Sequence, residues 1–179
     1  MMTKTIFSGF GGQGVLMMGY SLAHGAMSKG YQVTYLPAYG AEVRGGTANC
    51  TVAVADEEIT SPVSSEPDNL VVMNSPSLIT FQNKVIHHGI IFLNSSIVEN
   101  RPSRHDVQVY AVPCGKMAQE LGNIRVANII MMGAFIKKTG IVPADIYLKS
   151  LETVMGSRKK AAAEINRKAF AAGYDFVKD

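Results

Sequence analysis

The sequence TIFSGFGGQG at residues 5–14 is the most informative part of this chain, because a short apolar run leads directly into a glycine-rich turn. From Val15 to Lys29 the apolar residues recur at helical spacing, and Gly30 follows where a helix C-cap glycine would stand. Residues 31–36 then resemble a second strand. This order of strand, glycine turn, helix and strand predicts a βαβ unit.

The remaining sequence extends this unit into one α/β domain that covers residues 1–179. Further strands are expected at 47–55, 70–73, 89–93 and 107–112, and helices at 76–85, 116–121, 126–138, 143–155 and 157–172. Ser75 is the expected N-cap of the helix that begins at Pro76, and Gly173 is expected to end the last helix. The predicted fold has three layers, a mostly parallel sheet, a Rossmann-like start and a helical C-terminal end.

The glycine turn fits a G-x-G-x-x-G pattern through Gly9, Gly11 and Gly14. Such a turn brings backbone close to a ligand, and the free N–H groups at the following helix start favour an anion. A dinucleotide site also needs an acidic residue at the end of the second strand, but that strand ends in Leu-Pro-Ala at residues 36–38. No Gly-Lys-Ser/Thr follows the turn. NAD, FAD and Walker-type sites are therefore disfavoured, and a turn that only admits a partner's backbone stays an alternative.

A second glycine loop, PAYGAEVRGG at residues 37–46, follows the second strand. In a doubly wound sheet it would lie at the carboxyl edge beside the first glycine turn. Its charged residues Glu42 and Arg44 either present charge to a ligand or subunit, or form an ordinary surface ion pair. Asn128 interrupts a very apolar helix, and a buried asparagine needs hydrogen-bond partners, which are either loop backbone or a ligand.

Composition excludes several other classes of protein. The longest apolar runs are too short to span a membrane, and the N-terminus reaches glycine too early for a signal peptide, so a cytoplasmic protein is expected. The net charge is only +3, and the basic cluster at residues 158–160 is interpreted as a solvated helix face rather than a nucleic-acid site. Cys50 and Cys114 form no CxxC motif, so buried thiols are expected instead of a disulfide, zinc site or iron–sulfur cluster. The 10 methionines indicate either a Met-rich core or an apolar face that meets a partner.

The two glycine loops together resemble the gamma subunits of 2-oxoacid:ferredoxin oxidoreductases. The resemblance continues through residues 47–50, 73–78, 92–96 and 120–123 and ends with Ala127-Asn128 before Met132-Gly133-Ala134, so it covers nearly the whole chain. It implies a reaction of anaerobic metabolism in which a 2-oxoacid, coenzyme A and oxidised ferredoxin give acyl-coenzyme A, carbon dioxide and reduced ferredoxin. The substrate expected from the second loop is 2-oxoglutarate, with branched-chain 2-oxoacids as the alternative.

The resemblance further implies a division of labour between subunits. Alpha, beta and ferredoxin-like delta subunits would hold thiamine diphosphate, magnesium and the iron–sulfur clusters, while this chain would bind no cofactor alone and supply no catalytic residue or metal ligand. The isolated chain could form a homodimer. The alternative function is that of a stand-alone nucleotide-binding oxidoreductase domain. The candidate residues for cofactor binding or subunit contact are Gly9, Gly11, Gly12, Gln13, Gly14, Tyr39, Gly40, Glu42, Arg44, Gly45, Gly46 and Asn128.

Overall fold

The computed structural model of the chain describes residues 1–39, 46–61, 65–156 and 160–178. Its elements, in chain order, are β1 (Met2–Phe10), α1 (Val15–Ser28), β2 (Gln32–Tyr39), β3 (Thr47–Ala55), β4 (Asn69–Val72), α2 (Ser75–Phe81), the 3-10 helix η1 (Gln82–Lys84), β5 (Ile90–Asn94), β6 (Gln108–Val112), α3 (Cys114–Glu120), the 3-10 helix η2 (Ile124–Val126), α4 (Ala127–Thr139), α5 (Ala144–Met155) and α6 (Lys160–Phe176). Within these ranges the strands form one sheet in the order β2-β3-β1-β4-β5-β6.

The sheet is mostly parallel, as predicted, but one strand is inserted where the sequence predicted a simple βαβ unit. β3 pairs antiparallel with both β1 and β2, so β1 and β2 run in the same direction without being neighbours. The reason lies in the connection: only residues 40–46 separate β2 from β3, whereas a parallel neighbour needs a crossover of about a dozen residues or more. The carboxyl ends of β1, β2, β4, β5 and β6 consequently share one edge of the sheet.

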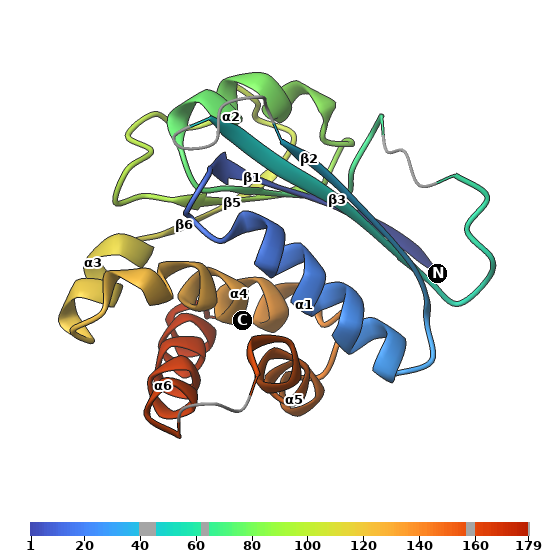
Figure 1. The fold of residues 1–179 in the computed structure, drawn as a ribbon. Helices are drawn as coiled ribbons and strands as arrows, with labels where there is room; N and C mark the ends of the chain where they lie inside the picture. Colours follow the sequence, from blue (N-terminus) through green and yellow to red (C-terminus); the bar gives the residue numbers. More distant parts are fainter. Residues whose placement is uncertain (40–45, 62–64, 157–159, 179) are drawn as a thin grey trace.

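The sheet is covered unequally on its two faces, which confirms the predicted three-layer arrangement. Helix α2 lies over one face, and α1, α3, α4, α5 and α6 gather on the other (Figure 1). The larger core, on the side with more helices, is built around aromatic contacts of Phe135 with Phe7 and Phe92, with ring centroids 5.5 and 5.4 Å apart. The smaller core beneath α2 contains Ile6, Leu70, Val72, Leu78, Val85, Ile91, Leu93 and Val98.

The predicted helix caps at Ser75 and Gly173 were wrong, each for a physical reason, and the helix expected at 76–85 ends at Phe81 and is followed by η1. The N-cap of α2 is Asn74, not Ser75, because the Asn74 Oδ1 atom accepts the Ser77 N–H at 2.9 Å. Helix α6 does not end at Gly173 but continues to Phe176. Gly173 lies inside the helix, and its α-carbon faces the backbone of α4. A Cβ added there would lie 2.6 Å from the carbonyl carbon of Ile130, which is why the position is a glycine. This glycine allows two helices to touch rather than ending one of them.

Candidate functional site

The glycine turn lies at the shared carboxyl edge of the sheet, but strand β1 extends further into it than the sequence indicated. Gly9 and Phe10 still belong to β1, where they pair with Ala48 and Thr47 of β3. The chain leaves the strand at Gly11 and Gly12, both of which are exposed. Gly9 is therefore a strand residue, and the exposed part of the turn is shorter than the motif.

The glycine turn and the second loop meet through a backbone hydrogen bond. The Gly11 N–H donates to the Gly46 carbonyl at 2.9 Å. Tyr39, at the other end of the second loop, closes the pairing of β2 with β3 opposite Ala48. The predicted site residues Gly40, Glu42, Arg44 and Gly45 lie outside the described residues. Among the described residues of the second loop, Gly46 is therefore the one that contacts the glycine turn.

Helix α1 begins at the glycine turn with its first N–H groups free of a side-chain cap. Gly14 is the N-cap residue in a left-handed conformation with φ 75°. Among the described residues no side chain caps the helix, and its first turn contains no acidic residue. Helix N-termini of this kind attract anions, because the unpaired N–H groups and the helix dipole both present positive charge. The edge beside Gly11 and Gly12 thus offers a place for an anionic group.

Asn128, the second residue of α4, packs its carboxamide against the start of α1. Its side chain is 5% exposed, and a Cβ added at Gly14 would lie 3.0 Å from the Asn128 Cγ atom. Within the described residues the Oδ1 atom of Asn128 is buried without a hydrogen-bond partner. A buried amide oxygen without a partner is costly, so a donor from outside the described residues would be stabilised there.

Two more asparagines at this edge were missed by the sequence analysis. Asn74 follows β4 and Asn94 ends β5, and both are buried. Asn94 Oδ1 accepts the Ser96 N–H at 3.2 Å, and the Asn74 Nδ2 atom is buried without a partner in the described part of the chain. Their signal was present in the sequence: each is a polar residue placed where a fully buried parallel strand ends.

The end of β2 bears on the dinucleotide interpretation. Leu36, Pro37 and Ala38 are exposed there, and none of them carries a carboxylate that could hold ribose hydroxyls. The two cysteines are buried, as predicted. Burial raises the pKa of the Cys50 thiol to about 12 and raises that of Cys114 as well, so both are protonated at neutral pH and are poor nucleophiles.

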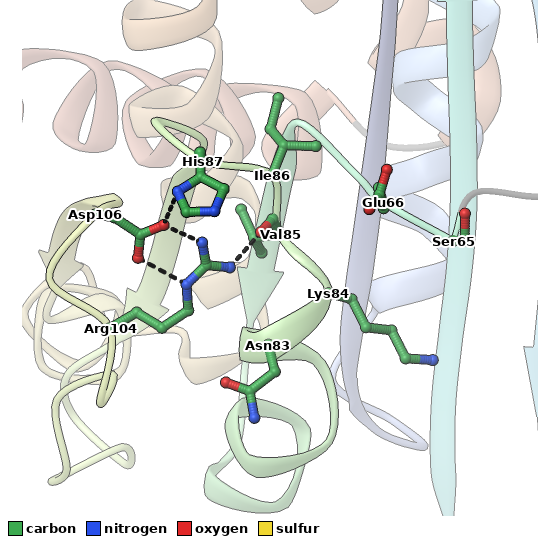
Figure 2. A pocket seen from close by; sticks show the side chains of 9 residues that line it. All are labelled: Ser65, Glu66, Asn83, Lys84, Val85, Ile86, His87, Arg104 and Asp106. Atoms are coloured by element: carbon green, nitrogen blue, oxygen red, sulfur yellow. Dashed lines mark hydrogen bonds and ion pairs between the residues drawn. The ribbon is translucent and has the colours of Figure 1, made fainter.

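A hollow lies at the opposite end of the sheet from the glycine turn, before β4, β5 and β6 begin. Its volume is about 770 Å³, and Figure 2 shows Arg104, Asp106 and His87 on one side of it and Glu66 on the other. The Asp106 carboxylate accepts hydrogen bonds from Arg104 Nε at 2.8 Å and from Arg104 Nη2, and its Oδ2 atom lies 2.8 Å from His87 Nδ1. Arg104 also binds the Gln82 and Val85 carbonyls. This cluster ties neighbouring loops together.

The Asp106 carboxylate is expected to stabilise the fold at neutral pH. The hydrogen bonds from Arg104 lower the pKa of Asp106 to about 2, below the ordinary value of about 3.9. Stability from this contact is therefore present above about pH 4 and is lost as the pH falls towards 2. Asp106→Asn should lower the melting temperature at pH 7 and flatten its decline between pH 4 and 2. Equal profiles for wild type and Asp106→Asn would contradict this role.

Known proteins with similar sequences are subunits of 2-oxoacid oxidoreductases. Residues 4–176 match the family described as pyruvate ferredoxin/flavodoxin oxidoreductase. The ketoisovalerate oxidoreductase subunit VorA of Methanothermobacter thermautotrophicus is 34% identical over 96% of this chain, which spans only 36% of the length of VorA. The 2-oxoglutarate synthase subunit KorC of Methanocaldococcus jannaschii is 30% identical, and the aligned region covers 96% of this chain and 92% of KorC.

Solved structures agree with these relatives. The gamma subunit of a keto/oxoacid ferredoxin oxidoreductase from Geobacter sulfurreducens superposes with a TM-score of 0.81 at 28% identity, covering 97% of this chain and 96% of that subunit. A 2-oxoglutarate:ferredoxin oxidoreductase from Magnetococcus marinus has the same fold in 32% of its chain, with a TM-score of 0.90 at 19% identity. In the part of this chain that the structure describes, no helix is both long and apolar enough to cross a bilayer.

Proposed function

Because this chain belongs to the pyruvate ferredoxin/flavodoxin oxidoreductase family, we propose that it is the gamma-type subunit of a 2-oxoacid:ferredoxin oxidoreductase. The complex would convert a 2-oxoacid and coenzyme A to acyl-coenzyme A and carbon dioxide while reducing ferredoxin. Thiamine diphosphate, magnesium and the iron–sulfur clusters would be held by the alpha, beta and delta subunits. This chain would assemble with them and shape the site, in the cytoplasm, without binding a cofactor alone.

One contact carries the more specific part of the proposal. The hydrogen bond from the Gly11 N–H to the Gly46 carbonyl joins the two glycine loops at the edge where α1 begins, and no side chain of the described residues caps this helix start. This combined surface, called here the glycine edge, comprises Gly11, Gly12, Gly14 and Gly46. We propose that it meets either the thiamine-bearing subunits or the path of coenzyme A, whose phosphates suit an anion-accepting helix start.

2-Oxoglutarate is the proposed substrate, with branched-chain 2-oxoacids as the alternative. The KorC of Methanocaldococcus jannaschii supports the first, because this chain matches 92% of its length. VorA relatives support the second through slightly higher identity, 34% against 30%. Purification of the native complex through a tag on this chain would identify its partners, and a panel of 2-oxoacids would rank the substrates. Recovery of this chain without larger thiamine-binding partners would overturn the proposed function.

A stand-alone nucleotide-binding oxidoreductase domain is the competing function. Two observations disfavour it. A dinucleotide site needs an acidic residue at the end of β2, where this chain has exposed apolar residues. It also needs a turn at Gly9, which here is a strand residue. Titration of the purified chain with NAD and with FAD separates the two functions. Saturable binding at micromolar concentration would favour the nucleotide-binding domain.

Arg44 provides a test of the second loop within the complex. Removing a charge that pairs with a buried group of a partner costs roughly 2–5 kcal/mol, whereas removing an exposed rim charge costs little. Arg44→Ala is therefore expected to weaken assembly or to raise the KM for coenzyme A, with an unchanged melting temperature of the chain. The control is Arg167→Ala, since Arg167 forms an exposed ion pair with Glu152 on the helical side. If both variants assemble and turn over like the wild type, Arg44 belongs to an ordinary surface loop.

A further inference from the structure

Gln13 holds the glycine turn against the end of β4 with its side chain. Its Oε1 atom accepts the Phe10 N–H at 2.7 Å, and its Nε2 atom donates to the Met73 carbonyl at 3.0 Å. The Gln13 backbone N–H also donates to the Phe10 carbonyl, at 3.1 Å. The carboxamide therefore uses its acceptor and one donor on the chain's own backbone, bridging the carboxyl ends of two neighbouring strands.

Gly9 provides the space in which this carboxamide lies. A Cβ added at Gly9 would be 2.5 Å from Gln13 Oε1, 2.9 Å from Met73 Cβ and 2.9 Å from Val15 Cγ1. These separations are all shorter than real Cβ contacts allow, so Gly9 is required by packing within the chain. The space beside the first glycine of the motif is therefore occupied by Gln13 and is closed to a ligand.

The exposed turn is consequently held at two points. Gln13 ties it to Met73, the residue after β4, and the hydrogen bond from Gly11 ties it to Gly46, the residue before β3. Between these points lies Gly12, with φ 95°, and none of the described residues comes within 4 Å of its Cβ position. Loss of the Gln13 side chain would free the β4 side while leaving the β3 side in place.

We propose that Gln13 is a positioning residue, which sets the place of Gly11 and Gly12 and touches neither coenzyme A nor a partner subunit itself. Its effect on turnover rests on the proposed function, because it acts through the glycine edge. Its effect on the turn rests only on the hydrogen bonds within the chain. The two effects are measured separately, so failure of one is distinguishable from failure of the other.

The turn is tested by amide hydrogen exchange of Phe10 in the purified full chain. Gln13→Ala removes the acceptor of this N–H and should speed its exchange about fivefold, since one hydrogen bond is worth about 1 kcal/mol. Gln13→Glu keeps an acceptor for Phe10 but loses the donor to Met73, so an intermediate rate is expected. The control Gln32→Ala, at an exposed position at the opposite end of the sheet, should exchange like the wild type. Unchanged exchange in Gln13→Ala would overturn the proposal.

Steady-state kinetics of the intact complex test how Gln13 acts. Gln13→Ala should raise the KM for coenzyme A about tenfold with kcat within about twofold, and Gln13→Glu should recover part of this change. A raised KM without faster exchange would mean direct ligand contact and would overturn the positioning role. Faster exchange in Gln13→Ala would uphold the role of Gln13 in the turn. If the KM for coenzyme A is nevertheless unchanged in both Gln13→Ala and Gly12→Val, the glycine edge is removed from the proposed function.

Discussion

Gly173→Ala is expected to lower the free energy of unfolding by about 3 kcal/mol or more, the largest stability loss predicted for a single added methyl group in this chain. The added Cβ would lie 2.6 Å from the carbonyl carbon of Ile130 in α4. The obstacle is backbone, which cannot rotate away as a side chain could. Helix α6 would have to move off α4, exposing Phe170 and other core residues.

The contact is reciprocal, which makes the loss harder to absorb. Gly133 of α4 faces α6 in the same way, and a Cβ there would lie 2.7 Å from the Tyr174 backbone nitrogen. Each helix therefore presents a glycine to the backbone of the other. Either substitution separates the same pair of helices, so the two single losses should not add in the double variant.

Urea unfolding of the purified chain measures this effect, with Gly25→Ala as the matched control. Gly25 is also a buried glycine within a helix, but its nearest neighbours, side-chain atoms of Ser150 and Val142, lie 3.5 Å from the added Cβ. Alanine there should be neutral or stabilising by up to about 1 kcal/mol, because it favours helix over glycine. A Gly173→Ala variant as stable as Gly25→Ala would contradict the close helix contact.

Gly14→Ala is the second large effect, expected to cost about 2–4 kcal/mol and to displace the start of α1. Two causes combine. Gly14 has φ 75°, a conformation that costs other residues about 1–2 kcal/mol, and its Cβ would meet the Asn128 carboxamide, with Cγ 3.0 Å away. Gly12→Ala isolates the backbone cause, because Gly12 has φ 95° and no described residue lies within 4 Å of its Cβ position.

A double-mutant cycle with Asn128→Ala completes this test by urea unfolding. Gly12→Ala should cost only the backbone part, about 1–2 kcal/mol. Asn128→Ala should recover part of the loss in Gly14→Ala, since it removes the clashing group. Strictly additive losses would show that Asn128 does not pack on Gly14.

Much of the fold could be predicted from apolar periodicity and glycine placement. Helix α1 begins at Val15 as expected, and every predicted strand is present within a few residues. The place of β3 could have been found too, because the short connection from β2 permits only antiparallel pairing. The role of Gly173 could not be predicted from the sequence, since a glycine near a helix end fits both a C-cap and a helix contact. Only the facing backbone of α4 distinguishes them.

The candidate site was predicted less completely than the fold. The meeting of the two glycine loops follows from strand direction, and Gly11 and Gly46 are in contact as that reasoning requires. The inward fold of the Gln13 side chain does not follow from the motif, because a glutamine in a loop can equally face solvent or a ligand. Asn74 and Asn94 were overlooked although polar residues at the ends of buried strands commonly mark a site.

The most direct test of the proposed function is an omission experiment on the reconstituted complex. Reduction of ferredoxin, dependent on 2-oxoacid and coenzyme A, would be measured with all subunits, without this chain, and with this chain alone plus thiamine diphosphate and magnesium. The full complex should turn over, the mixture without this chain should lose turnover that re-adding it restores, and the chain alone should be inactive. Turnover by the chain alone, or full turnover in its absence, would contradict its assignment as a non-catalytic subunit that assembles and shapes the site.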